Sequence, residues 1–170
     1  MNNLPVELQL QIIHFLTPQS MAKLNCVWNL AKLSNEEITF LWKNKKYESV
    51  WFDCISKGYI NLIKLITEYH ILDINIQSSL GHAAIHYVCG YNQIDILRLL
   101  ISKNVNLWIE DNSGYVGFQY ASAKGSVNIV KLLIEQNPSK NNKYYEKALF
   151  LARIGKHRDI IKIIKELLYC

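Results

Sequence analysis

Asp95-Ile96-Leu97-Arg98-Leu99-Leu100 is the stretch that decides the fold, because the same pattern occurs four times in this sequence. The other copies are NLIKLI at 61–66, NIVKLL at 128–133 and DIIKII at 159–164. Successive copies begin 34, 33 and 31 positions apart. A period near 33 residues is typical of stacked helical repeats rather than of one globular core. The pattern therefore predicts an all-α solenoid, a fold class that mostly serves as a binding surface.

Each copy is expected to form the longer helix of a helix pair. Apolar residues fill four of its six positions, and so wide an apolar stripe requires burial against neighbours on both sides. Leu99 and Leu132 are therefore predicted to be buried between adjacent units. A shorter apolar segment precedes each copy and ends at a turn residue that favours a left-handed backbone; these residues are Gly58, Asn92, Gly125 and Gly155.

The spacing divides the chain into an N-terminal helical module, residues 1–45, and a repeat region of four units at about 46–77, 78–110, 111–142 and 143–170. In the module, Pro5 suits the first position of a helix. Ser34 and Glu37 form a capping box for a later one. Three short helices in about 45 residues cannot bury their apolar surface alone. The module therefore needs the repeats, a partner, or both.

Composition excludes several classes of function. Half of the residues are apolar and 19% are charged, as in a folded soluble protein. The four cysteines lie far apart and no Cys/His cluster occurs, so neither a metal site, a cofactor nor a disulfide framework is expected, and a reducing compartment is the simpler interpretation. No apolar run approaches the roughly 20 residues that span a bilayer. No nucleophile–base pair or phosphate-binding loop indicates an enzyme.

The net charge of +5 comes entirely from the end of the sequence, where residues 140–170 hold 8 Lys/Arg and 3 Asp/Glu against 11 and 11 before them. A basic end can meet nucleic acid or an acidic protein, but it also keeps the last repeat of a stack soluble. We favour this polar capping face, because no nucleic-acid-reading motif is present.

Two motifs in the repeat region resemble ankyrin repeats. Gly81-His82-Ala83-Ala84-Ile85-His86 is similar to the family's Gly-x-Thr-Pro-Leu-His, and Asp111-Asn112-Ser113-Gly114 resembles the turn that opens a repeat. The resemblance covers about 125 residues, with another helix-pair repeat such as HEAT as the alternative. It departs from the family where Thr-Pro is replaced by Ala83-Ala84 and by Val116-Gly117, and this loss should loosen the hairpin loops.

The ankyrin resemblance implies roles for several residues. His86 falls where the family has a structural histidine, and Cys54 and Cys89 fall in the core between short helices. Trp108 is either packed in a hairpin or an exposed contact. The family binds targets with its hairpin tips and short helices, and this face would include Ser56, Lys57, Leu80, His82, Tyr91, Glu110, Asn112, Ser113, Tyr115, Lys124 and Arg153.

The N-terminal module resembles an F-box. It begins Leu4-Pro5-Val6-Glu7-Leu8, continues through Ile12, Leu16, Pro18 and Val27-Trp28, and closes with Leu41-Trp42. An F-box docks on the adaptor subunit of SCF-type ubiquitin ligases and so reaches a cullin scaffold. By this resemblance the adaptor-binding residues are Leu4, Pro5, Leu8, Ile12 and Leu16. The alternative is a plain helical cap for the solenoid.

Together the two resemblances predict the substrate-recognition subunit of an SCF-type ubiquitin ligase, with the F-box on the adaptor and the repeats on an unknown target protein. The alternative is an ankyrin scaffold or inhibitor without a ligase. Neither hypothesis involves catalysis, nucleic acid or a membrane. The arrangement resembles proteins that intracellular bacteria and large DNA viruses place in eukaryotic hosts, so the cytoplasm of a eukaryotic cell is the expected location.

Overall fold

The computed structural model describes residues 47–58, 60–68, 72–136 and 142–169. The N-terminal module, with Leu4, Pro5, Leu8, Ile12 and Leu16, lies outside these residues, so its fold and its role remain predictions. The described residues form only helices and no strands. They run in pairs: α4 (Tyr47–Ser56) with α5 (Ile60–Glu68), α6 (Ala84–Gly90) with α7 (Ile94–Ser102), α8 (Gly117–Lys124) with α9 (Val127–Glu135), and α10 (Asn142–Ile154) with α11 (Arg158–Tyr169).

The turns within the pairs have the left-handed backbone that the sequence predicted, with one correction. Gly58, Asn92 and Gly125 have φ angles of 75°, 56° and 77°. In the last pair the left-handed residue is Lys156, with φ of 57°, and the prediction of Gly155 is wrong. The N–H of Gly155 still donates to the carbonyl of Leu151 at 3.0 Å, so the helical hydrogen bonding of α10 continues to Gly155 and the turn comes one residue later.

The chain divides into two compact units, and the described helices of the first, α4 and α5, pack on each other. Their core contains Trp51, Ile55, Ile63 and Ile66, all fully buried. Cys54 is also buried there, and burial raises the pKa of its thiol to about 12. Cys89 of the second unit is fully buried too. Both cysteines are therefore core residues, as predicted.

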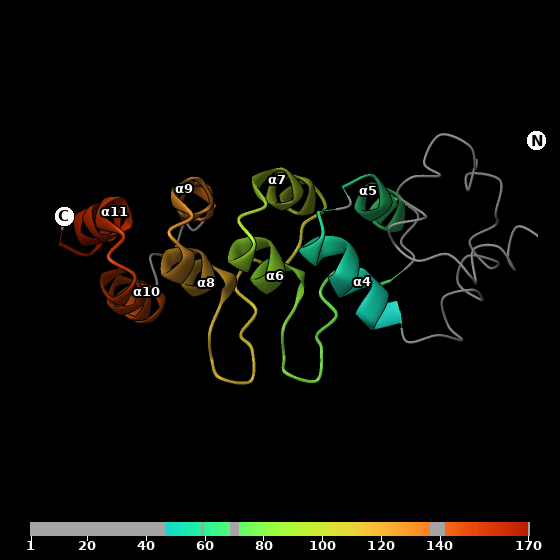
Figure 1. The fold of residues 1–170 in the computed structure, drawn as a ribbon, viewed down its shortest axis with the longest axis horizontal. Coiled ribbons are helices and arrows are strands. Elements are labelled where there is room, and N and C mark those ends of the chain that lie inside the picture. The colour runs from blue at the N-terminus through green and yellow to red at the C-terminus, as the bar shows by residue number, and fades with distance from the viewer. Residues whose placement is uncertain (1–46, 59, 69–71, 137–141, 170) are drawn as a thin grey trace, which may run out of the picture. The chain divides into compact units, whose positions relative to one another are not determined.

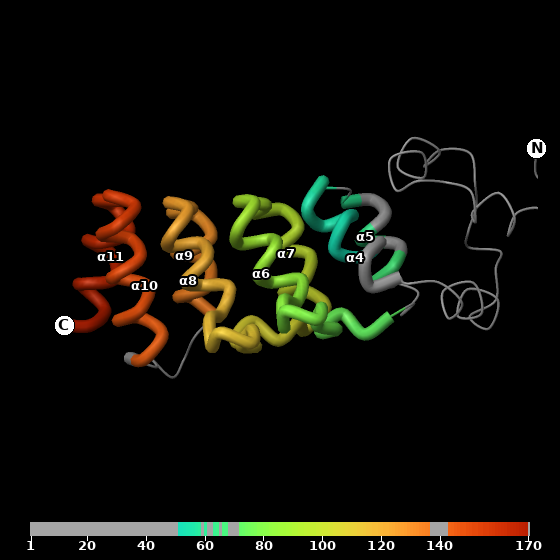
Figure 2. Tube along the Cα trace, turned by 60° about the horizontal axis from the view of Figure 1, so that its bottom comes forward, coloured from blue at the N-terminus to red at the C-terminus, as the bar shows by residue number. Residues whose placement is uncertain are grey.

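The second unit, residues 75–170, is built of two layers of helices. Figure 1 shows α6, α8 and α10 in one layer and α7, α9 and α11 in the other, and Figure 2 shows the same pairs side by side. Helix α8 packs between α6 and α10, and α9 contacts α7 and α11. The loop of residues 103–116 projects from the layer of α6, α8 and α10 (Figure 1).

The second helix of each pair buries the apolar side of the repeated pattern. It is the longer helix of the α6–α7 and α8–α9 pairs, as predicted, but α10 has 13 residues against 12 in α11, and α4 has 10 against 9 in α5, which corrects the prediction for those pairs. In α7 this side consists of Ile96, Leu97 and Leu100. Leu132 of α9 is buried as predicted, but Leu99 of α7 is only half-buried, which corrects the prediction of its burial. A helix places residues 96, 97 and 100 on one face at 100° per residue, and Leu99 lies beside that face.

Aromatic side chains join the third and fourth helix pairs of the described region. Phe118 of α8 is fully buried and meets the ring of Tyr145 edge-on, with centroids 5.1 Å apart. Trp108 contacts Phe118 at 6.1 Å and stacks on Tyr144 at 5.8 Å. The question that the sequence left open for Trp108 is thus answered, because its indole is half-buried and packs against the rings of Phe118 and Tyr144.

The exposed side of α11 is largely charged, with Arg158, Asp159, Lys162, Lys165 and Glu166 exposed. This distribution agrees with the polar capping face suggested for the basic end, and the suggestion remains a prediction. Among the described residues, no helix combines the length and the apolar character that crossing a bilayer requires.

Candidate functional site

Two hairpin loops of the second unit repeat the same turn. In the first loop, the N–H of Ser78 donates to the carbonyl of His82 at 2.9 Å. In the second loop, the N–H of Asp111 donates to the carbonyl of Tyr115 at 2.8 Å. Gly81 and Gly114 have φ of 78° and 71°, respectively, a conformation that favours glycine. The glycine spacing of 33 residues thus marks equivalent turns.

Side chains and backbone tie the two loops to each other. Gln77 donates through Nε2 to the carbonyl of Glu110 at 2.9 Å. Asn112 donates its backbone N–H to Leu80 at 3.2 Å and its side-chain amide to Ser79 at 3.0 Å. These bonds hold neighbouring loop tips in fixed register, so they form a continuous platform beside the short helices.

The short helices begin with a side-chain bond that compensates for the missing Thr-Pro. Nδ1 of His86 accepts the N–H of Ala83 at 2.9 Å, and Oε1 of Gln119 accepts the N–H of Val116 at 2.8 Å. Each is half of a capping box, since neither N-cap residue has a side-chain hydroxyl. His86 also bonds the carbonyl of Tyr115 at 3.1 Å. Burial lowers the pKa of the His86 imidazole, so the ring is neutral at neutral pH. Its role is structural, as predicted.

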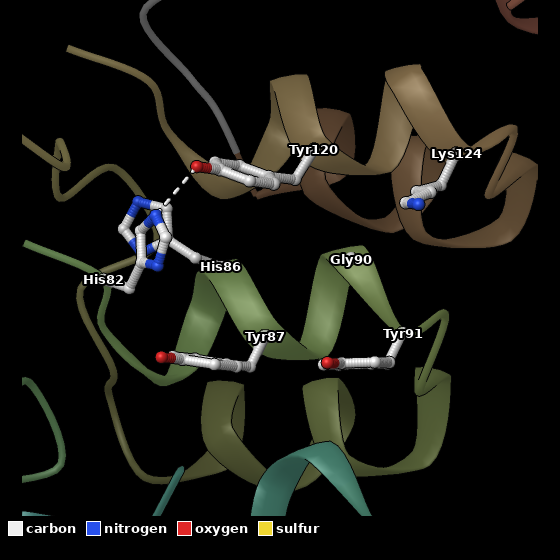
Figure 3. A pocket seen from close by; sticks show the side chains of 7 residues that line it. All are labelled: His82, His86, Tyr87, Gly90, Tyr91, Tyr120 and Lys124. Carbon is white, nitrogen blue, oxygen red and sulfur yellow. Dashed lines mark hydrogen bonds between the residues drawn. The ribbon is translucent and has the colours of Figure 1, made fainter. Parts of the chain in front are cut away.

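A pocket of about 310 Å³ opens between α6 and α8 (Figure 3). One end holds a hydrogen-bonded cluster: the hydroxyl of Tyr120 donates to Oδ2 of Asp111 at 2.6 Å and lies 3.0 Å from Nε2 of His82. Because the single hydroxyl proton of Tyr120 goes to Asp111, we infer that His82 donates from Nε2 to the Tyr120 oxygen. The lining consists of His82, His86, Tyr87, Gly90, Tyr91, Tyr120 and Lys124.

A second, smaller pocket of about 200 Å³ adjoins it between α8 and α10. Its lining consists of Tyr115, Gln119, Tyr120, Ala123 and Leu151. Tyr120 lines both pockets, so two hollows meet at this residue along the layer of α6, α8 and α10. Aromatic side chains in such hollows are the residue types that dominate the energetics of protein interfaces.

A family model described as ankyrin repeats, in three copies, matches residues 51–144. The chain belongs to the ankyrin-repeat family. No curated protein matches it. Ankyrin repeats are typically interaction modules without enzymatic activity, and they imply a protein partner. This result decides against the HEAT alternative and confirms the coarser part of the functional prediction, a role in protein–protein interaction.

Nine of the eleven residues predicted to bind a target fall into two groups in the ankyrin stack. One group is exposed and contains Leu80, Tyr91, Lys124 and Arg153. The other is engaged in the protein's own contacts: Lys57 pairs with Asp53, His82 bonds Tyr120, Glu110 bonds Lys143 and Tyr144, Asn112 bonds Ser79, and Tyr115 lies under the ammonium of Lys147. Target binding by either group remains a prediction.

Sequence reasoning missed three residues that shape the larger ankyrin pocket. Tyr87, Gly90 and Tyr120 line the larger pocket but were absent from the predicted face. A signal for two of them existed, because Tyr87 and Tyr120 are 33 residues apart and hold equivalent positions in their short helices. Nothing in the sequence marked Gly90 as a pocket residue. A missing side chain leaves an opening only where the neighbouring helix does not fill the space.

Asp111 holds the second ankyrin hairpin together. Its Oδ1 accepts the N–H of Ser113 at 2.8 Å and of Tyr115 at 3.0 Å, and its Oδ2 accepts the Tyr120 hydroxyl. Burial acts to raise the pKa of Asp111, but the bonds from Tyr120, Tyr115 and Ser113 outweigh it, so the pKa lies below its usual range.

Replacing Asp111 by Ala should lower the free energy of unfolding by about 2 kcal/mol at neutral pH, because buried donors lose a charged acceptor. A carboxyl with a depressed pKa stabilises the folded state above its unfolded pKa of about 3.9, and this contribution disappears as pH falls through the folded value. Urea denaturation should therefore show a difference between wild type and D111A that shrinks below about pH 4. The exposed Asp95→Ala is the control, and an equal loss in both variants contradicts the assignment.

Proposed function

We propose that this chain is a receptor that holds a target protein on the face made by α6, α8, α10 and the two hairpin loops. The single observation that supports this most strongly is the pair of adjoining pockets that share Tyr120. The exposed Tyr91 follows α6 directly, and the exposed cations Lys124 and Arg153 lie on α8 and α10 of the same layer. Aromatic anchors combined with charges at the rim are typical of surfaces that bind proteins.

We propose further that residues 1–45 act as an F-box and connect this face to the adaptor of an SCF-type ubiquitin ligase. The support is in the sequence: Leu4-Pro5-Val6-Glu7-Leu8 at the start, and Leu41-Trp42 directly before the repeats. Leu4, Pro5, Leu8, Ile12 and Leu16 are the proposed contacts with the adaptor. Burial of their apolar surface drives the association, at roughly 25 cal/mol per Å² before the costs of binding.

In this mechanism the chain performs no chemistry. It raises the effective concentration of the target's lysines near the ubiquitin-loaded enzyme that the cullin scaffold recruits. The rate of ubiquitin transfer then depends on how long the target stays bound to the ankyrin stack and on the geometry of the assembled ligase.

Affinity capture from eukaryotic lysate tests the ligase connection. We expect the wild-type chain to retain the adaptor and the cullin, and Leu4→Ala combined with Leu8→Ala to lose both while keeping the target. Leu80→Ala is the matched control, because Leu80 is an exposed leucine of the repeat region and its truncation should leave the adaptor bound.

Two other outcomes would contradict parts of this proposal. Failure of the wild-type chain to retain an adaptor from a lysate that contains one removes the ligase connection and leaves the alternative, an ankyrin scaffold or inhibitor. Retention of the adaptor by the double variant at the wild-type level shows that the F-box contacts are assigned wrongly.

A further inference from the structure

Gly90 differs from every other glycine in the chain. Of the seven glycines, Gly58, Gly81, Gly114 and Gly125 have positive φ angles. Gly117 and Gly155 face atoms at 2.7 Å and 2.4 Å from where a Cβ would stand. At Gly90 the backbone is helical, and a Cβ would meet nothing within 4 Å. Neither turn geometry nor packing therefore requires a glycine here.

The missing side chain of Gly90 leaves open space in the larger pocket, which Gly90 lines on α6 across from Lys124 on α8 (Figure 3). The volume of about 310 Å³ exceeds the roughly 150 Å³ of a protein cavity that binds benzene. The pocket is thus large enough for an aromatic ring or a branched aliphatic side chain, together with a neighbouring group at its mouth.

The histidine end of the pocket suits an apolar guest. Nε2 of His82, the hydroxyl of Tyr120 and the carboxylate of Asp111 are bonded to one another, and both ring nitrogens of His86 are bonded to backbone groups. An apolar side chain placed against these rings therefore removes no hydrogen bond and leaves none of those polar atoms unpaired. Tyr91, which is 58% exposed, forms part of the rim.

Lys124 gives the opposite wall a charge. Its side chain is exposed and makes no hydrogen bond or ion pair with any other residue that the structure describes. It is the only lysine or arginine among the lining residues. The pocket contains enough aromatic rings to attract a cationic guest, but the ammonium of Lys124 repels such a guest and attracts a carboxylate instead.

We propose that this pocket, lined by Tyr87, Gly90, Tyr91 and Tyr120, receives an aromatic or branched aliphatic side chain of the target, and that Lys124 binds a carboxylate on the same short segment. The target is thereby a protein with an exposed acidic segment that contains one large apolar residue. This inference rests on the proposed target-binding role and is independent of the ligase connection.

A display library of random twelve-residue peptides, selected against the full chain, provides the test. The enriched peptides should combine a large apolar residue with Asp or Glu. In fluorescence polarisation, their affinity should fall about tenfold or more for Gly90→Leu, which fills the pocket, and for Lys124→Glu. Asn128→Leu and Lys131→Glu make the same kinds of change at exposed positions of α9 and should leave affinity unchanged.

A charge exchange separates binding from structure. A peptide in which the acidic residue is replaced by Lys should bind Lys124→Glu more tightly than it binds wild type, an effect that altered folding does not produce. Unchanged melting temperatures should accompany both pocket variants. Peptides that bind wild type and Gly90→Leu equally overturn the pocket assignment while leaving the ankyrin stack as a binding surface. Enrichment of no peptide at all counts against both the pocket and the proposed target-binding role.

Discussion

Replacing Phe118 by Ala is expected to lower the free energy of unfolding by about 3–5 kcal/mol, the usual cost of truncating a buried aromatic side chain. Phe118 is fully buried in α8 and contacts the rings of Tyr145 and Trp108. Its removal leaves a cavity at the junction of two helix pairs. Because every pair relies on its neighbour for burial, the loss should appear in the main unfolding transition, measured by urea denaturation with circular dichroism.

Phe150→Ala is the matched control, since it removes the same side chain one repeat later. Phe150 is 63% exposed on α10, so its truncation should change the free energy of unfolding by no more than about 0.5 kcal/mol. Equal losses in the two variants would show that Phe118 is not at a buried junction and that the assigned stacking of α8 on α10 is wrong.

Gly81→Ala should cause the second largest loss in the free energy of unfolding. Gly114→Ala is the matched comparison, because it makes the same change in the equivalent turn. Both glycines have positive φ, and a side chain in that conformation costs about 1–2 kcal/mol. At Gly114 the added Cβ finds its nearest neighbour at 3.7 Å. At Gly81 it would lie 2.5 Å from the backbone nitrogen of Asn112. This clash adds about 1–3 kcal/mol and separates the two hairpin loops.

Thermal and urea unfolding of the two variants measure the difference directly. G81A should be less stable than G114A, and only G81A should lose the bonds that join Asn112 to Leu80 and Ser79. Amide resonances of residues 79–82 and 110–113 should move accordingly in G81A. Equal stability of the two variants would mean that the loop tips yield without cost and do not form a fixed platform.

The sequence predicted the helix pairs because the repeated apolar pattern depends only on residue order. The period of about 33 identified the longer helices, and Gly58, Asn92 and Gly125 marked their turns. The left-handed turn residue Lys156 was missed because glycine adopts a left-handed backbone more readily than lysine, so the sequence favoured Gly155. The N–H of Gly155 instead continues the helical hydrogen bonding of α10. The burial of Leu99 was overestimated because the pattern alone does not locate the edge of a helix face.

The candidate site was less accessible to sequence reasoning. The exposed hairpin tip Leu80 and the exposed Tyr91 were anticipated from the family pattern. The larger pocket was not anticipated, because it is formed by the rings of Tyr87 and Tyr120 on neighbouring helices and by the open space at Gly90. Stacking of Trp108 on Tyr144 likewise joins residues from different repeats. Such relations depend on tertiary packing, which single-sequence periodicity does not specify.

The main contacts of α8 are with α6, α10 and its own partner α9, and this neighbour-only arrangement affects how the protein loses its structure. Fraying that starts in α11 and α10 reaches α8 one helix pair at a time. The larger pocket lies on the far side of α8, against α6. Partial melting of the last pair therefore releases the charged end first, and the larger pocket stays formed until the fraying reaches α8 itself.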